Sequence, residues 1–500
     1  MKTKKTLFDI TVFKNNIKKT WTVSAVAVPV LYLTMILPIM MNVLSQPGDP
    51  GGQFEVEILT CLGANFNTII MVAVTVSALM AVILFSYLQR SRAVSFYHSL
   101  PISREGLLFT NFVSALTIMY LPNVVISLVM FIQVKIMGYS AFSEIMVWLL
   151  VLCVEELYFF TLAVLFMMLC GNEIVSVIAY GILVFGPKYV VILLNSILTT
   201  VTYGYELGEI PYHLYRFIPS WRFEGIYLKV WKEPKGEDVI VHHEFWNLGS
   251  TLAIALAVTA VMLVIILLVY KKRRSETAGD LISARWFKPV ATAGVVIIFA
   301  IMITSLLASG IVDKTVTRYS NEMKAVTVAS LTVVGFIGYF AVKLIAGRNK
   351  FRPGKSAVSS FIFACFMVIL GLGVLLLSDR LEKYTPNAED VESARFFNVV
   401  MGPEGADGTV NPECVCKQFD VTDKDTIARI IELNRKAYSG RENWLLYGES
   451  DGYENVTISY ILKDTMVAGN TLEEKIQVTR TYSISRKDMF FEEVNSELNR

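Results

Sequence analysis

A series of long apolar runs, which begins near residue 22 and ends near residue 378, constrains this chain more than any other feature. Each run is about as long as the roughly 20 residues with which an α-helix crosses the hydrocarbon core of a bilayer. A mean hydropathy of +0.53 and 54% hydrophobic residues agree with a chain that lies largely in lipid. We therefore predict a mainly α, polytopic membrane helical bundle with about nine spans. The predicted spans are 22–44, 66–88, 107–134, 145–169, 174–198, 250–270, 289–311, 323–345 and 359–378.

The distribution of Lys and Arg among the connecting segments predicts the orientation of the chain. If the N-terminus is cytosolic, the inside segments carry twenty Lys and Arg, whereas the outside segments carry nine. Cytosolic loops of membrane proteins carry an excess of these residues. We therefore predict a multi-pass protein of the cell membrane with a cytosolic N-terminus, and nine crossings leave the C-terminus extracytoplasmic.

The polar segment 89–106, between the second and third predicted spans, is short and cationic. It contains three Arg and no acidic residue before Glu105. Phe96, Tyr97 and Leu100 are interspersed with polar residues, a pattern typical of an amphipathic helix that docks on another protein. The simpler interpretation is a positively charged loop that only orients the two flanking helices.

The run Phe96-Tyr-His-Ser-Leu-Pro-Ile-Ser-Arg104 resembles the corresponding loop of type-2 ABC exporter permeases of Gram-positive bacteria. In that family the loop is a coupling helix, which sits in a groove of a separate ATP-binding subunit. The resemblance covers about residues 1–275, and the rest of the chain departs from the six-helix core of the family. The residues that it assigns to ATPase coupling are Phe96, Tyr97, His98, Leu100, Pro101 and Arg104.

This resemblance implies a permease subunit of an ATP-driven exporter, which works with a cytosolic ABC ATP-binding subunit. A second permease subunit, identical or paralogous, would complete the pathway, and lipid would surround the pair. The sequence contains no Gly-x-x-x-x-Gly-Lys-Ser/Thr motif, so ATP and Mg²⁺ are expected on the partner and no enzymatic activity on this chain. No basic arm indicates nucleic acid, and the six Cys do not occur at zinc-binding spacing, so no metal site is expected.

The resemblance, together with hydropathy and composition, divides the chain into three parts. Residues 1–275 correspond to the permease core with six spans, and residues 276–378 add three spans. Residues 379–500 are charged and rich in turns, so they are expected to form a small α+β extracytoplasmic domain. Its predicted helix covers 423–434, and its predicted strands include 455–462 and 476–484.

The N-terminal residues 6–21 show helical periodicity before the first predicted span. Leu7, Ile10, Phe13, Ile17 and Trp21 recur on one side, and Lys residues occupy the other. This pattern is typical of a helix that lies in the membrane interface, and the exporter family has an elbow helix at this position.

Three charged residues fall inside predicted spans: Glu155 and Glu156 in the fourth and Lys188 in the fifth. A charge near the bilayer centre costs a few kcal/mol on insertion scales and therefore needs a partner or a water-filled path. Glu155 and Lys188 lie equally far in sequence from the turn between the spans, which predicts that they pair. Glu156 is then expected to face the pore or a partner subunit. A static ion pair, a role in substrate passage and a proton relay all remain open.

The external loop 199–249 is rich in aromatic residues. Such residues are typical of an interfacial belt, whereas the exporter family places short re-entrant helices here, which close the outer mouth of the pathway. The candidate outer-gate residues are Tyr215, Phe217, Pro219 and Trp221.

Two other classes of function remain open alongside the exporter. The chain could be a membrane sensor that binds an extracellular ligand through residues 379–500, or an ion-coupled secondary transporter that uses the charges within its spans. Neither the transported substrate, the direction of transport nor the identity of the second permease subunit follows from the sequence.

Overall fold

A computed structural model of the chain gives the positions of most of the residues in the predicted spans. The residues that it describes are 8–38, 40–41, 66–99, 102–136, 141–205, 223, 226–235, 238–273, 279, 282–284, 286–312, 319–347, 353–400, 415–439, 453–466 and 474–485.

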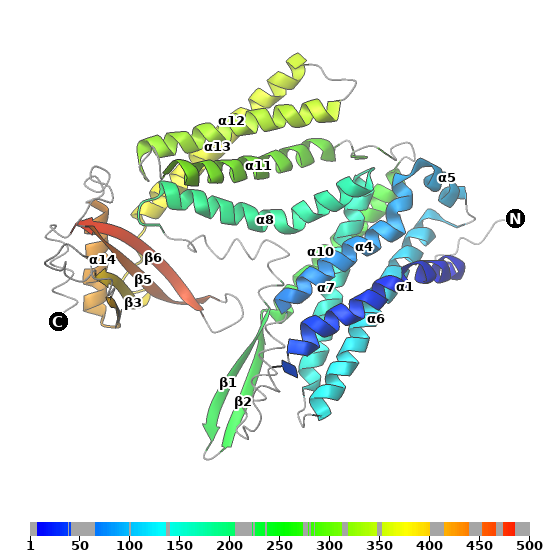
Figure 1. The fold of residues 1–500 in the computed structure, drawn as a ribbon, viewed down its shortest axis with the longest axis horizontal. Helices are drawn as coiled ribbons and strands as arrows, with labels where there is room; N and C mark the ends of the chain where they lie inside the picture. The colour runs from blue at the N-terminus through cyan, green and yellow to red at the C-terminus, as the bar shows by residue number, and fades with distance from the viewer. Residues whose placement is uncertain are drawn as a thin grey trace, which may run out of the picture. The chain divides into compact units, whose positions relative to one another are not determined.

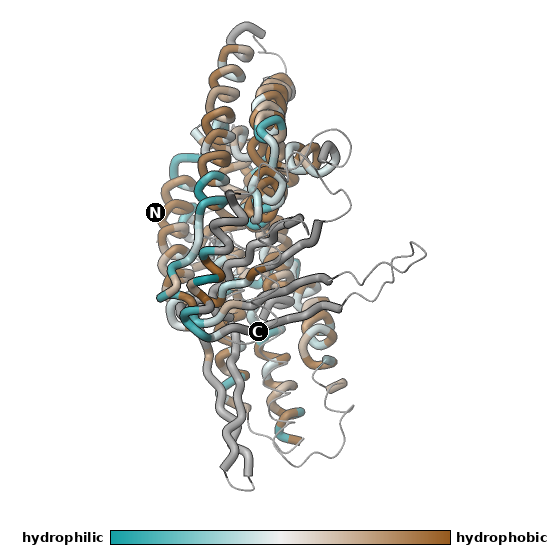
Figure 2. The backbone as a smooth tube through the Cα atoms, turned by 90° about the vertical axis from the view of Figure 1, so that its left-hand side faces the viewer, coloured by the Kyte–Doolittle hydropathy of each residue, from teal (hydrophilic) through white to brown (hydrophobic). Residues whose placement is uncertain are grey.

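Nine helices in these ranges are long and apolar enough to cross a membrane, which confirms the predicted polytopic helical architecture. Figure 2 shows the apolar residues that run along them. In chain order the elements are α1 (Ile10–Leu31), continued by the π-helical η1 (Tyr32–Ile36), α4 (Phe66–Phe85), continued by the 3₁₀-helical η2 (Ser86–Gln89), α6 (Arg104–Ile136), α7 (Phe142–Leu169), α8 (Glu173–Val201), α10 (Leu248–Lys272), α11 (Phe287–Val312), α12 (Asn321–Gly347) and α13 (Pro353–Lys383).

The chain packs into two compact units, and the boundary between them crosses α8 (Figure 1). The first unit comprises Met1–Pro187, Tyr215–Ala291 and Gly469–Leu472. The second comprises Lys188–Leu214, Thr292–Ala468 and Glu473–Arg500.

Helix α7 is the centre of the first unit, where it packs against α4, α6 and α10. Its sequence is apolar around its whole circumference, and such a helix is stable only when its neighbours cover all of its faces. Accordingly Trp148, Phe159 and Phe160 are each no more than 1% exposed. This helix therefore carries any polar residue in its middle into the core of the unit.

The N-terminal segment differs from the predicted elbow helix. Helix α1 runs without a break from Ile10, and the Asp9 carboxylate accepts hydrogen bonds from the first-turn amides. Its buried stripe is polar, and Asn16 donates to Asn111 Oδ1 of α6 at 2.8 Å. Trp21 is 58% exposed. The segment predicted as an interfacial helix is therefore continuous with the first apolar helix, and polar contacts join its buried side to α6.

A pair of antiparallel strands lies within the aromatic segment 199–249. Strands β1 (Tyr227–Lys235) and β2 (Asp238–Trp246) pair antiparallel, from Tyr227 opposite Trp246 to Lys235 opposite Asp238. Strands were not predicted here, although the valines, isoleucine and aromatic residues of 227–246 are typical of strands.

The second unit contains a helical part in which α12 and α13 make extensive contact. Gly335 of α12 faces Met367 of α13, and a Cβ atom at Gly335 would lie 2.7 Å from the Met367 Cγ atom. Only a residue without a side chain allows these helices to approach so closely.

The second unit also contains a four-stranded antiparallel sheet in the order β4-β3-β5-β6. Helix α14 contacts β3, and Ile427, Ile430 and Ile431 on this helix are buried. The predicted helix and strands of this region are observed at these positions. The elements are β3 (Val391–Val400), β4 (Val415–Val421), α14 (Lys424–Ser439), β5 (Tyr453–Met466) and β6 (Glu474–Ser485).

Candidate functional site

The segment between α4 and α6 forms a separate short helix, α5 (Ser91–Ser99), as its amphipathic pattern indicated (Figure 1). Arg90 has an extended backbone and turns the chain between η2 and α5. Ser103 begins the next helix, because its Oγ accepts a hydrogen bond from the Gly106 amide at 3.0 Å. The chain therefore leaves one spanning helix, forms α5 and enters the next one within a few residues.

One face of α5 is packed into the first unit and another is open. Val94 is only 2% exposed, and the ring of Tyr97 lies 4.5 Å from that of Tyr87, centroid to centroid. In contrast, Phe96 is 62% exposed, and Arg92 is exposed beside it. An exposed aromatic side chain on a helix fixed from behind is a suitable anchor for a protein partner.

Side chains hold the base of α5 against the beginning of α8. Gln89 Nε2 donates to Ser176 Oγ at 2.7 Å, and both residues are buried. Arg90 Nε pairs with Glu173 Oε1 at 2.8 Å on the surface. A displacement of α5 would therefore be transmitted to the first turn of α8.

Helix α10 contacts both sides of the same segment. Lys271 Nζ of α10 pairs with Glu105 Oε1 of α6 at 2.9 Å. The hydroxyl oxygens of Tyr87 in η2 and Tyr270 in α10 lie 3.1 Å apart. These contacts connect α10 with the ends of α4 and α6.

Arg273, directly after α10, lies beneath this segment and binds four main-chain carbonyls. Its Nη1 donates to Met167 O at 2.7 Å and Met168 O at 3.0 Å, and its Nη2 donates to Leu88 O at 3.0 Å and Cys170 O at 3.1 Å. The carbonyls at a helix C-terminus have no partner within the helix. One guanidinium therefore caps α7 and binds the end of η2 at the same time. Burial lowers the pKa of Arg273 to about 10, so it stays charged at neutral pH.

The chain after Arg273 continues the cap on α7. The amides of Ser283 and Ala284 both donate to Leu169 O, at 2.9 and 3.1 Å. The Gly279 amide donates to Gly171 O at 2.8 Å. Sequence reasoning counted Arg273 only as one of several cytosolic cations, because nothing in a run of four basic residues shows which side chain turns inward.

The predicted coupling residues have different environments. Phe96 and Arg104 are exposed, and Tyr97 is packed against Tyr87. The side chain of His98, and both Leu100 and Pro101, lie outside the described residues.

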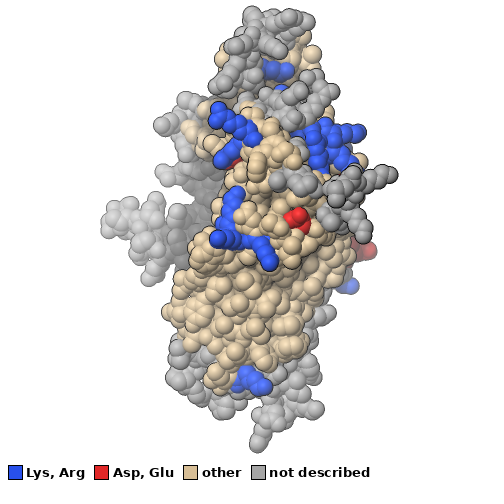
Figure 3. Space-filling view, turned by 90° about the vertical axis from the view of Figure 1, so that its right-hand side faces the viewer, with Lys and Arg blue, Asp and Glu red and all other residues tan. Residues whose placement is uncertain are grey.

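Cations gather around α5, and Figure 3 shows Lys and Arg above a broad surface with few charges. This arrangement fits a membrane protein in which charged side chains remain outside the lipid. Among the described residues of the first unit, the exposed basic ones at this end include Lys14, Lys18, Lys19, Arg90, Arg92, Arg104, Lys271, Lys272 and Lys288.

The two acidic residues in α7 are buried in the first unit. Glu156 is 2% exposed, and its Oε2 accepts a hydrogen bond from Asn123 Nδ2 at 2.8 Å. Neither carboxylate oxygen of Glu155 accepts a hydrogen bond from the residues that the structure describes, and Lys188 belongs to the second unit, so their pairing stays a prediction. The Glu156 side chain contacts Asn123 of α6, and its predicted position at a pore or a partner subunit stays a prediction.

The four candidate outer-gate residues, Tyr215, Phe217, Pro219 and Trp221, lie outside the described residues. In the ranges that the structure covers, no group of three or more His, Cys, Asp or Glu could hold a metal ion. No family model, curated protein or solved structure matches the chain. The geometry at α5 and in α7 is therefore the basis of any functional assignment.

Proposed function

We propose that this chain is the permease subunit of an ATP-driven ABC exporter in a Gram-positive cell membrane. Segment 89–106 would couple it to a separate ATP-binding subunit in the cytosol. The observation that supports this most is α5, a short helix between two spanning helices that exposes Phe96 while its other face is packed. The resemblance of residues 96–104 to the coupling loop of that family agrees with it.

The contacts of α5 are suited to transmit force. A partner that moves Phe96 would displace η2 through the Tyr87–Tyr97 contact. It would displace α8 through the ion pair of Arg90 and Glu173. Rigid-body movement of packed helices is a common way to switch between states. Closure of two ATPase subunits would then tilt α4 and α6, while Arg273 keeps η2 attached to α7.

The remaining parts of the assembly follow from this role. A second permease subunit, identical or paralogous, would form the pathway together with this chain. ATP and Mg²⁺ would bind to the cytosolic partner, and this chain would not be an enzyme. Its N-terminus would be cytosolic, and the sheet of β3 to β6 with α14 would form a small extracytoplasmic α+β domain.

Affinity purification of the full chain from native membranes tests this proposal. An ABC ATPase, recognised by its phosphate-binding motif in the sequenced peptides, should co-purify with the wild type. Phe96→Ala should lose most of that ATPase but insert normally into the membrane. Phe361→Ala is a matched control, because Phe361 on α13 is 65% exposed and should not affect the association. Co-purification that is equal for all three proteins would remove the coupling role of α5.

A membrane sensor is a second candidate, and the sheet after α13 favours it. Four strands and a helix with a buried isoleucine face form a folded structure that an export pathway does not need. Addition of cell-wall fragments or extracellular peptides to the purified full chain should raise its melting temperature if this part binds them. A melting temperature unchanged by all of them would remove this candidate.

A further inference from the structure

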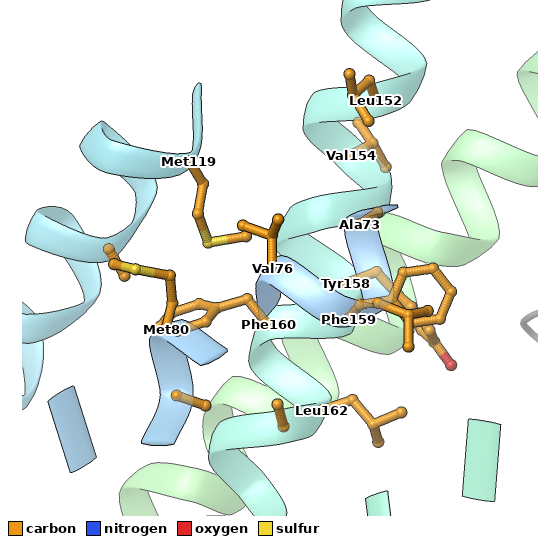
Figure 4. Close-up of a cluster of buried hydrophobic side chains, with 14 of the residues drawn as sticks. Ala73, Val76, Met80, Met119, Leu152, Val154, Tyr158, Phe159, Phe160 and Leu162 are labelled. Carbon is orange, nitrogen blue, oxygen red and sulfur yellow. The ribbon is translucent and has the colours of Figure 1, made fainter. Parts of the chain in front are cut away.

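The middle of α7 brings two carboxyl groups into the apolar centre of the first unit. Glu155 is 0% and Glu156 is 2% exposed, and both lie halfway along a spanning helix. Figure 4 shows a cluster of buried hydrophobic side chains from α4, α6 and α7 in the same unit. The labelled residues are Ala73, Val76, Met80, Met119, Leu152, Val154, Tyr158, Phe159, Phe160 and Leu162.

The hydrogen bonds of the two carboxyl groups differ. Asn123 Nδ2 donates to Glu156 Oε2, and Ser77 Oγ donates to the Glu156 main-chain carbonyl at 3.4 Å. Both oxygens of Glu155 are buried without a partner. On α6, Asn123 Oδ1 and Ser127 Oγ are also buried and have no partner. A polar set from three helices therefore meets here with part of its bonding capacity unused.

No cation from the elements packed against α7 faces this set. Helix α4 has no titratable residue, and the charged residues of α6 and α10 lie at their ends. Lys188 belongs to the second unit. The titratable residues between the ends of α6, α7 and α10 are Tyr120, Cys153, Glu155, Glu156 and Tyr158, and Tyr180 of α8 donates to Val74 O of α4.

The free-energy cost of burying charge decides whether both carboxyl groups are ionised or only one. A single charge at the centre of a bilayer costs about 2.5–3.5 kcal/mol on insertion scales. Two carboxylates at adjacent positions would also repel each other, so they cannot both ionise readily. Asn123 stabilises negative charge on Glu156, whereas nothing does so for Glu155. A metal ion fits less well, because the Asn123 amide group presents a positively polarised N–H to Glu156.

We propose that Glu155 and Glu156 form a proton-binding site inside the membrane part of the chain. The proton adds to a carboxylate oxygen of Glu155, which forms one O–H bond and turns the carboxylate into a neutral acid. Asn123 orients Glu156 as the group that keeps any negative charge. This inference does not rest on the proposed exporter function, since it follows only from the contacts within the first unit.

Infrared spectroscopy of the purified full chain tests the site, because a neutral carboxylic acid absorbs in a region where carboxylates and amides do not. The wild type at pH 7 should show a buried neutral-acid band that shifts slightly in deuterium oxide. The band should be lost in Glu155→Gln and retained in Glu156→Gln. Glu144→Gln is the matched control, since Glu144 is also a buried acid of α7, and its spectrum should keep the band.

Three results would overturn the proposal. The first is a wild-type spectrum without a neutral-acid band, and the second is a band that survives in Glu155→Gln. The third is a melting temperature that rises with added sodium chloride in the wild type but not in Glu155→Gln, which would make the ligand a metal cation. If Glu155→Gln does not accumulate, loss of the band in Glu156→Gln would contradict the assignment and its retention would support it.

Discussion

The end of the first unit at α5 and the middle of α7 treat polar groups in opposite ways. Around α5, Arg273 alone satisfies four carbonyls, and Arg90 and Lys271 each have an acidic partner. In α7, Glu155 has no hydrogen bond, and Asn123 uses only its amide nitrogen. The contacts around α5 hold this helix in place when a partner moves it, whereas the middle of α7 can exchange a proton.

Loss of Arg273 should have the largest effect, because it leaves several buried carbonyls without donors. Hydrogen bonds to charged groups contribute about 1.5–3 kcal/mol each, and the bonds within one group are not additive. We expect Arg273→Gln to lower the stability of the chain by roughly 3 kcal/mol or more, measured as a fall in melting temperature in detergent. Lys272→Gln removes a neighbouring exposed cation and should leave the melting temperature nearly unchanged. Equal effects of the two substitutions would contradict the role of Arg273 in capping α7 and holding the end of η2.

Replacement of Asn123 examines the middle of α7. Asn123→Leu keeps a similar volume but removes the donor to Glu156 Oε2, so we expect a loss of about 1–3 kcal/mol. Thermal unfolding of the purified variant measures it. The loss should be smaller when Glu156→Gln is already present, because a neutral amide needs the donor less. Effects that simply add would show that Asn123 does not act through Glu156.

Truncation of Phe96 should change partner binding and leave stability intact. An exposed aromatic anchor typically contributes about 2 kcal/mol at an interface, so we expect more than a tenfold loss of affinity for the ATPase. Tyr97→Ala should differ, since the ring packs on Tyr87 and its loss should also lower the melting temperature. Binding measured with the co-purified ATPase and unfolding of the isolated chain separate these two outcomes.

The exposed pair of Arg90 and Glu173 should give the smallest effect. Ion pairs on a surface contribute about 0.2–1 kcal/mol, and salt weakens them. A double-mutant cycle of Arg90→Ala and Glu173→Ala, measured by unfolding at low and high salt, should find a coupling in that range that declines with salt. A larger coupling energy that is insensitive to salt would show that the Arg90–Glu173 pair holds α5 in place more strongly than Arg273 does.

Hydropathy and periodicity were enough to predict the helices of this chain. Spanning helices need long apolar runs, and α5 needs its alternation of Val94, Phe96 and Tyr97 with polar residues, so both signals are local in sequence. The same holds for α14 and the strands β5 and β6, whose patterns are those of ordinary amphipathic elements.

The pairings between distant residues could not be predicted. The hydrogen bond from Asn123 of α6 to Glu156 of α7 was not foreseen, because the rotation of each helix about its axis decides which side chains meet. For the same reason Asn16 of α1 meets Asn111 of α6, although its own segment suggested an interfacial helix. Arg273 was missed because capping carbonyls carry no side-chain signal in the sequence.

Site-specific cross-linking at α5 tests whether this helix contacts a cytosolic ABC ATPase. A cysteine introduced as Phe96→Cys, in a chain whose own cysteines are replaced, should form a cross-link to a cytosolic ABC ATPase in native membranes. A cysteine introduced at the exposed α13 residue as Phe361→Cys in the same background should form none. If α5 is the coupling helix, only position 96 should give a cross-linked ATPase. Labelling of that cysteine by a membrane-impermeant reagent added outside intact cells would contradict it.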